Sequence, residues 1–92
     1  MPIGRFTHIY ISPKQGVSKA QVEEQINNAL DWYRYDDKNY VVYTTSEVHV
    51  WLKRMQALAE PDGRLLISEL NPNAKPNGWM NLDFWDWIKK AR

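Results

Sequence analysis

The fold of this chain depends on residues 31–45, which read DWYRYDDKNYVVYTT. Aromatic and β-branched side chains fill residues 32–35 and 40–45, a composition that favours strands. The Asp, Lys and Asn residues between them, at 36–39, are typical of a tight turn. A β-hairpin is therefore predicted. Residues 32–35 can alternatively extend the helix expected before them, which would leave three strands.

Another strand is predicted upstream, over Arg5–Ser12. Phe6, His8 and Tyr10 alternate there with smaller, mainly aliphatic side chains at positions 7, 9 and 11. Successive side chains of a strand point to opposite faces of a sheet, so one face is expected to be aromatic and the other aliphatic. Pro13 cannot donate to a ladder and ends the strand.

Two helices are predicted around the hairpin. The first covers Lys19–Leu30, because Ser18 and Gln21 form a capping-box pattern before an apolar residue series. The second begins at a cap on Thr45 or Ser46. Its apolar side chains recur at helical spacing and form one stripe, made of Val48, Trp51, Leu52, Met55, Leu58 and Ala59.

The last third of the chain adds one strand and one helix. A turn at residues 61–63 leads into a strand over Arg64–Leu70. Residues 71–80 are rich in Asn and Pro and are expected to be linker-like. A terminal helix is predicted over 81–92, starting at Asn81 with its apolar residues from Leu82 to Ala91.

The predicted order is βαββαβ followed by a terminal helix. This order indicates an α+β, ferredoxin-like two-layer sandwich, in which two helices cover one face of an antiparallel sheet. The 92 residues form a single domain with its core at about 5–70. The second face of such a sheet is bare, so another element or another molecule is expected to cover it.

Composition limits the classes of function. Twelve Lys and Arg against eleven Asp and Glu leave a formal charge of +1, which disfavours nucleic-acid binding through bulk charge. The chain has no Cys, which excludes disulfides and thiolate sites. No apolar run approaches the length of a membrane span, and the N-terminus lacks a signal pattern. We therefore expect a cytoplasmic protein with no membrane partner and no cofactor.

Several segments resemble the SinR-like small proteins, relatives of the VapD-type and CRISPR-adaptation endoribonuclease-like superfamily. The resemblance lies in residues 40–45 with the following helix, in residues 63–70, and in a Trp-rich tail formed by 78–80 and 84–89. It implies a ferredoxin-like fold, a tendency to form homodimers and an ancestry linked to RNA cleavage. The nuclease branch places an Asp at the end of its first strand, where two such residues hold a divalent metal across a dimer. Ser12 stands at that position here, and a hydroxyl is a poor ligand for a hard cation.

Candidate catalytic residues are few and weak. His8, Asp31 and Glu69 are the side chains that could act in acid–base or metal chemistry, but the sequence partners none of them at ligand spacing. Asp36 and Asp37 are paired carboxylates whose position favours a role in the hairpin turn. No catalytic site and no metal site are therefore predicted.

Aromatic residues give the candidate binding surface. Exposed aromatic faces of sheets are typical of oligomer interfaces, in which Tyr, Trp and Phe are enriched. Cover by the terminal helix of the same chain is a second interpretation, and stacking of single-stranded nucleic acid is a third. Trp85 and Trp87 are expected to point to different faces of that helix, so that one of them can reach a partner. The interface candidates are Phe6, His8, Tyr10, Trp32, Arg34, Trp85 and Trp87.

The sequence thus favours a non-catalytic homodimer that acts by binding a protein or a nucleic acid. A metal-dependent endoribonuclease with altered ligands is one alternative. A module that binds a nucleotide or a single strand on its aromatic sheet face is the other.

Overall fold

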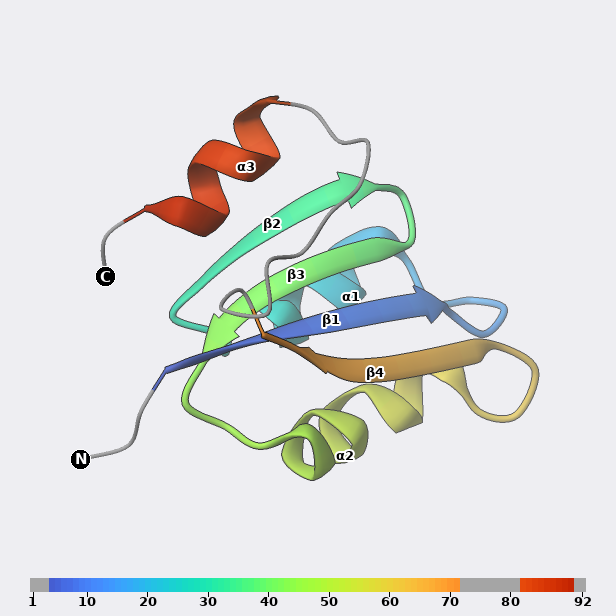
Figure 1. The fold of residues 1–92 in the computed structure, drawn as a ribbon. Coiled ribbons are helices and arrows are strands. Elements are labelled where there is room, and N and C mark those ends of the chain that lie inside the picture. Colours follow the sequence, from blue (N-terminus) through green and yellow to red (C-terminus); the bar gives the residue numbers. More distant parts are fainter. Residues whose placement is uncertain (1–3, 72–81, 91–92) are drawn as a thin grey trace.

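The computed structural model describes residues 4–71 and 82–90, which form four strands and three helices (Figure 1). None of the described helices is long and apolar enough to cross a membrane. The elements in chain order are β1 (Arg5–Ser12), α1 (Lys19–Ile26), β2 (Asp31–Asp36), β3 (Asn39–Thr44), α2 (Val48–Ala59), β4 (Arg64–Leu70) and α3 (Leu82–Lys89).

The four strands form one antiparallel sheet in the order β2-β3-β1-β4. The predicted hairpin is confirmed, because residues 32–35 lie within β2 and pair with β3. The helical alternative for these residues is therefore wrong. The pairing of β2 with β3 shifts register between Arg34 and Asp36, whereas β1 and β4 pair without interruption from Phe6↔Leu70 to Ser12↔Arg64.

Helices α1 and α2 cover one side of the sheet, here called the first face (Figure 1). The aliphatic side chains of β1 point to this side, as predicted from their alternation. Each buried side chain of this size contributes about 1.5–3 kcal/mol of transfer free energy, so the first face holds the main core. Its buried residues are Ile9, Ile11, Val22, Ile26, Tyr40, Val42, Trp51 and Met55.

The first helix begins as predicted but ends earlier. The side chain of Ser18 accepts from the backbone N–H of Gln21, and the Gln21 side chain accepts from the Ser18 N–H, which completes the capping box. The helix stops at Ile26, not at Leu30. Two consecutive Asn residues follow, which have low helix propensity, and the Leu30 N–H already donates to the carbonyl of Tyr43 on β3.

The start of α2 also differs from the prediction. Glu47 is its N-cap residue and makes no side-chain cap hydrogen bond. The hydroxyls predicted to cap the helix have other positions or partners, since Thr45 precedes the cap by two residues and the Ser46 hydroxyl accepts from the Arg54 guanidinium. The apolar stripe itself is confirmed in part: Trp51, Met55 and Ala59 are buried, while Leu52 stays exposed.

The α2–β4 connection requires a glycine at position 63. A Cβ atom there would lie 2.3 Å from the carbonyl oxygen of Ser12 and 2.7 Å from that of Ala59. Both contacts are with backbone atoms, which cannot rotate away as a side chain can. Gly63 therefore allows the start of β4 to approach the end of β1 closely.

The other side of the sheet, the second face, carries α3. Phe84 and Ile88 of α3 are buried against Phe6 and Val41 in a separate, smaller core. Figure 1 shows this helix next to β2, on the side opposite α1 and α2. The predicted terminal helix is therefore confirmed over Leu82–Lys89. The predicted linker from residue 72 onward, the start at Asn81 and the end at residues 91–92 fall outside the described residues.

Candidate interaction surface

Strand pairing decides which candidate residues share the second face. Phe6 lies opposite Tyr43, and His8 lies opposite Val41, which in turn lies opposite Tyr33 of β2. Residues that pair directly point to the same side of an antiparallel sheet. The second face is therefore aromatic across three strands.

Helix α3 covers the half of this face next to β2. The indole of Trp87 lies 5.6 Å from the ring of Phe6 and 5.9 Å from that of Tyr33, measured between centroids. Its Nε1 donates to Oδ2 of Asp31 over 3.0 Å. Trp85 packs against the ring of Phe84 at 5.1 Å and is partly buried in the same cluster. Cover by the chain's own terminal helix, one of the three interpretations, thus accounts for this half.

The other half, formed by β1 and β4, is open among the described residues. His8, Tyr10, Leu66 and Ser68 are the residues that define this open half. Leu66 lies directly opposite Tyr10 and is 61% exposed, although it sits in the middle of a strand. Leu66 continues into the partly exposed rings of Tyr10 and His8, and contiguous exposed apolar patches are typical of interaction sites.

His8 belongs to a polar cluster at the border of the two halves. Its Nε2 and the Tyr35 hydroxyl are hydrogen-bonded at 2.5 Å, and the two rings are stacked with centroids 5.7 Å apart. Burial lowers the pKa of His8 below its usual value of 6.5, although Asn39 and Asp36 act in the opposite direction. Burial likewise raises the pKa of Tyr35. The cluster therefore favours a neutral His8 and a neutral Tyr35.

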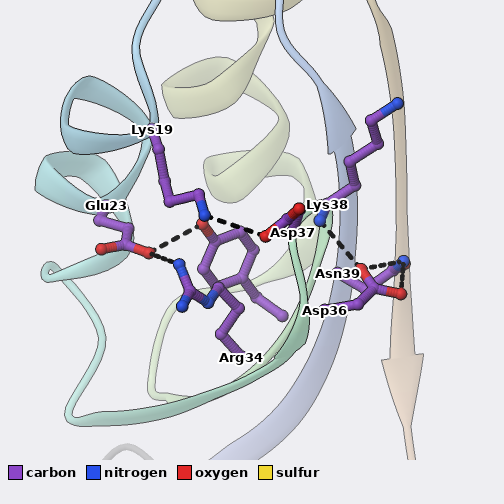
Figure 2. Close-up of polar contacts among 8 residues, drawn as sticks. Lys19, Glu23, Arg34, Asp36, Asp37, Lys38 and Asn39 are labelled. Carbon is purple, nitrogen blue, oxygen red and sulfur yellow. Dashed lines mark hydrogen bonds and ion pairs between the residues drawn. The ribbon is translucent and has the colours of Figure 1, made fainter.

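Asp36 supports this cluster from the hairpin turn. Its carboxylate accepts from the Lys38 backbone N–H and from the Asn39 amide, both at 2.9 Å (Figure 2). These hydrogen bonds, the one from the Lys38 N–H foremost, lower the pKa of Asp36. The carboxylate is used within its own turn, and not as part of a catalytic pair with Asp37, which instead binds Lys19 at 3.0 Å.

Arg34, one of the predicted interface residues, lies on the opposite side of the sheet from His8 and Tyr10. Its guanidinium donates to Glu23 of α1 at 3.0 Å, and the same carboxylate accepts from the Tyr40 hydroxyl at 3.1 Å (Figure 2). Trp32 is likewise directed to the first face, where its Nε1 donates to Asn27. Trp32 and Arg34 therefore do not share a face with His8 and Tyr10, in contrast to the predicted interface set.

The three weak catalytic candidates do not meet. His8 and Asp31 share the second face but lie on β1 and β2, which are two strand spacings, or about 10 Å, apart with β3 between them. Glu69 lies opposite Thr7, a residue of the first face, and is exposed at the β4 edge. Among residues 4–71 and 82–90, no three His, Asp or Glu side chains are grouped so that they could hold a metal ion.

No family model, no curated protein and no solved structure matches this chain.

Sequence reasoning missed Tyr35 and Leu66 as members of this surface. Side chains in residues 32–35 alternate between two faces, but this alternation does not determine which pair shares a face with Phe6. The predicted interface includes Trp32 and Arg34, whereas the pairing with β3 places Tyr33 on the face of Phe6. The position of Leu66 could be predicted from its neighbours. If Leu65 and Ile67 face the helices, Leu66 between them must face the other side of the sheet.

Proposed function

We propose that this chain is a non-catalytic, homodimeric protein of ferredoxin-like topology that acts by binding protein. The observation that carries the proposal is the open half of the second face, where the exposed Leu66 lies directly opposite the half-buried Tyr10. Burial of such a surface is favourable at about 25 cal/mol per Å² of apolar area. The ordinary charge balance of the chain also fits a protein partner better than a polyanion.

The ferredoxin-like topology within this proposal draws support from two features. The elements follow one another in the order βαββαβ, and β1 and β3 are the two central strands of the sheet. Both crossover helices, α1 and α2, pack on the same face. The kinship with SinR-like small proteins belongs to the same proposal and rests on the sequence segments quoted for it.

Sedimentation equilibrium of the full chain at micromolar concentration tests the proposal. A species of twice the 10.9 kDa chain mass is expected, with dissociation on dilution. Only monomer across the accessible concentration range would refute the homodimer.

A second candidate function is binding of a nucleotide or a single strand by the same open half. It is favoured by the partly exposed rings of His8, Tyr10 and Tyr35, because bases stack on such side chains. Titration of a fluorescent single-stranded oligonucleotide tests it. Binding that weakens with salt and is lost in Tyr10→Ala supports the candidate, and no binding at low salt rules it out.

The metal-dependent ribonuclease is the remaining alternative. It would need ligands drawn from His8, Asp31 or Glu69, which lie in separate places. Magnesium-dependent cleavage of single-stranded RNA that is lost in His8→Ala would favour it over the binding functions.

A further inference from the structure

The two edges of the sheet differ in how they are protected. Edge strand β2 is interrupted by the register shift at Arg34 and Asp36, and α3 packs against it. Edge strand β4 pairs with β1 without a shift. Its two charged residues, Arg64 and Glu69, lie toward its ends, and the central residues 65–68, Leu-Leu-Ile-Ser, include no charge and no Pro. Natural sheets normally block exposed edges with those devices, so β4 has the properties of an edge that another strand covers.

The hydrogen-bonding groups on the outer side of β4 follow from the ladder. The Ile11 N–H donates to the carbonyl of Lys38 before β3, so odd-numbered residues of β1 bond to β3 and even-numbered ones to β4. Through the register His8↔Ser68, the even-numbered residues of β4 bond to β1. The N–H and C=O groups of Leu65, Ile67 and Glu69 therefore point outward, where the described part of the chain places no further strand.

Exposed leucines lie on both sides of this edge. Leu66 is on the second face, and Leu52 of α2, 45% exposed, is on the first face. Leu52 and Leu65 line a groove of about 250 Å³ between α2 and β4, together with Gln56 and Ala59. A strand added to β4 would therefore meet apolar side chains above and below its backbone.

We propose that β4 pairs antiparallel with β4 of a second copy of this chain, in a register centred on Leu66. This inference rests on the proposed homodimer and names its interface. It joins the two sheets into one of eight strands, with α2 of each copy beside the junction. The shared two-fold axis makes the interface self-complementary.

The register follows from comparing the pairings that a two-fold axis allows. Centred on Leu66, the pairing sets Leu65 opposite Ile67 of the second copy on the first face, and the two Leu66 side chains opposite each other on the second face. Centred one residue earlier, it would set Leu66 opposite Arg64. Centred one residue further on, it would set Leu65 opposite Glu69, and two residues further on Ile67 opposite Glu69. Only the first choice matches apolar with apolar throughout the centre.

Leu66 would occupy a position that does not exchange hydrogen bonds, because its own groups bond to β1. Side chains at such positions approach most closely across an antiparallel pair. Opposite charges at position 66 should therefore attract across the junction, and like charges should repel.

Two charge variants test the inference by sedimentation equilibrium. Leu66→Lys and Leu66→Glu are each expected to raise the dissociation constant of the homodimer by about tenfold or more, since each sets like charges opposite one another. An equimolar mixture of the two is expected to recover dimer. Leu30→Lys is the matched control, because Leu30 is 66% exposed and lies on the α1–β2 connection, away from β4. The dissociation constant of this variant's homodimer should equal that of the wild type.

The outcomes distinguish a failure of the β4 interface from a failure of the proposed homodimer. Wild-type dimer with unchanged Leu66 variants overturns the β4 interface and leaves the homodimer standing. Weakened variants whose mixture stays monomeric overturn the register centred on Leu66. A monomeric wild type overturns the proposed homodimer itself. Leu66 is accessible, so far-UV circular dichroism equal to wild type is expected for both variants.

Discussion

Trp87 on the terminal helix donates its indole N–H to the carboxylate of Asp31, the first residue of β2, 56 positions earlier in the chain. The Lys90 ammonium lies 3.8 Å from the same carboxylate oxygen. The contact joins α3 to the edge of the sheet that β2 forms. It helps hold α3 over this half of the second face, whereas no other element among the described residues covers the half next to β4.

Removing that acceptor should loosen α3. Asp31→Ala is expected to lower the free energy of unfolding by about 1–2 kcal/mol, because the partly buried indole N–H loses its charged acceptor. Asp31→Asn keeps an acceptor oxygen and should cost less. Asp86→Ala, at an exposed position of the same helix, should change stability by no more than about 0.5 kcal/mol. Urea denaturation measures all three, and equal effects at positions 31 and 86 would contradict the role of this contact.

Replacing either of two buried threonines on the first face by valine should change the stability of the protein, but in opposite directions. The hydroxyl of Thr7, 0% exposed, has no hydrogen-bond partner among the described residues. Thr7→Val removes that unsatisfied group and is expected to stabilise the protein by about 1 kcal/mol.

Thr44 provides the matched comparison, since it is 1% exposed and its hydroxyl accepts from the indole N–H of Trp51 at 3.1 Å. Thr44→Val should destabilise the protein by about 1–3 kcal/mol, because that buried donor is left unpaired. Thermal denaturation of the two variants gives the comparison. Destabilisation by both substitutions would show that the Thr7 hydroxyl is satisfied in solution.

Tyr40 should make the protein sensitive to high pH. Burial, followed by the nearby carboxylate of Glu23, raises the pKa of Tyr40 from 10.0 to about 12. Between these values the unfolded chain loses the phenolic proton first, so the folded state binds more protons and stability falls as pH rises. Below pH 10 this contribution is fully present.

Denaturant midpoints of wild type and Tyr40→Phe across the alkaline range measure that effect. The wild type should lose stability more steeply than the variant between pH 10 and about 12. Parallel curves for the two proteins would contradict the elevated pKa of Tyr40.

Local patterns predicted most of the fold. The alternation along β1, the turn residues at 36–39 and the stripe of α2 each depend on neighbours in sequence, and each gave the correct type of element. The ends of α1 and α2 were less accurate, because Leu30 and Ser46 make contacts with β3 and with Arg54 that no local rule contains.

The candidate surface was predicted only in part, for a different reason. Phe6, His8 and Tyr10 were placed correctly on one face by period-two alternation. The phase of β2 relative to them depends on how it pairs with β3, and α3 covers only one half of the face because of tertiary packing. Neither relationship can be read from a single strand.

Amide hydrogen exchange along β4 tests the self-pairing of this strand most directly. The outward N–H groups of Leu65 and Ile67 should exchange slowly at protein concentrations above the dissociation constant and rapidly on dilution below it. The N–H of Leu66, bonded to β1, should exchange slowly at both concentrations and serves as the internal reference. Exchange of Leu65 and Ile67 that is equally fast at both concentrations, in a sample that is dimeric at the higher one, would contradict the account.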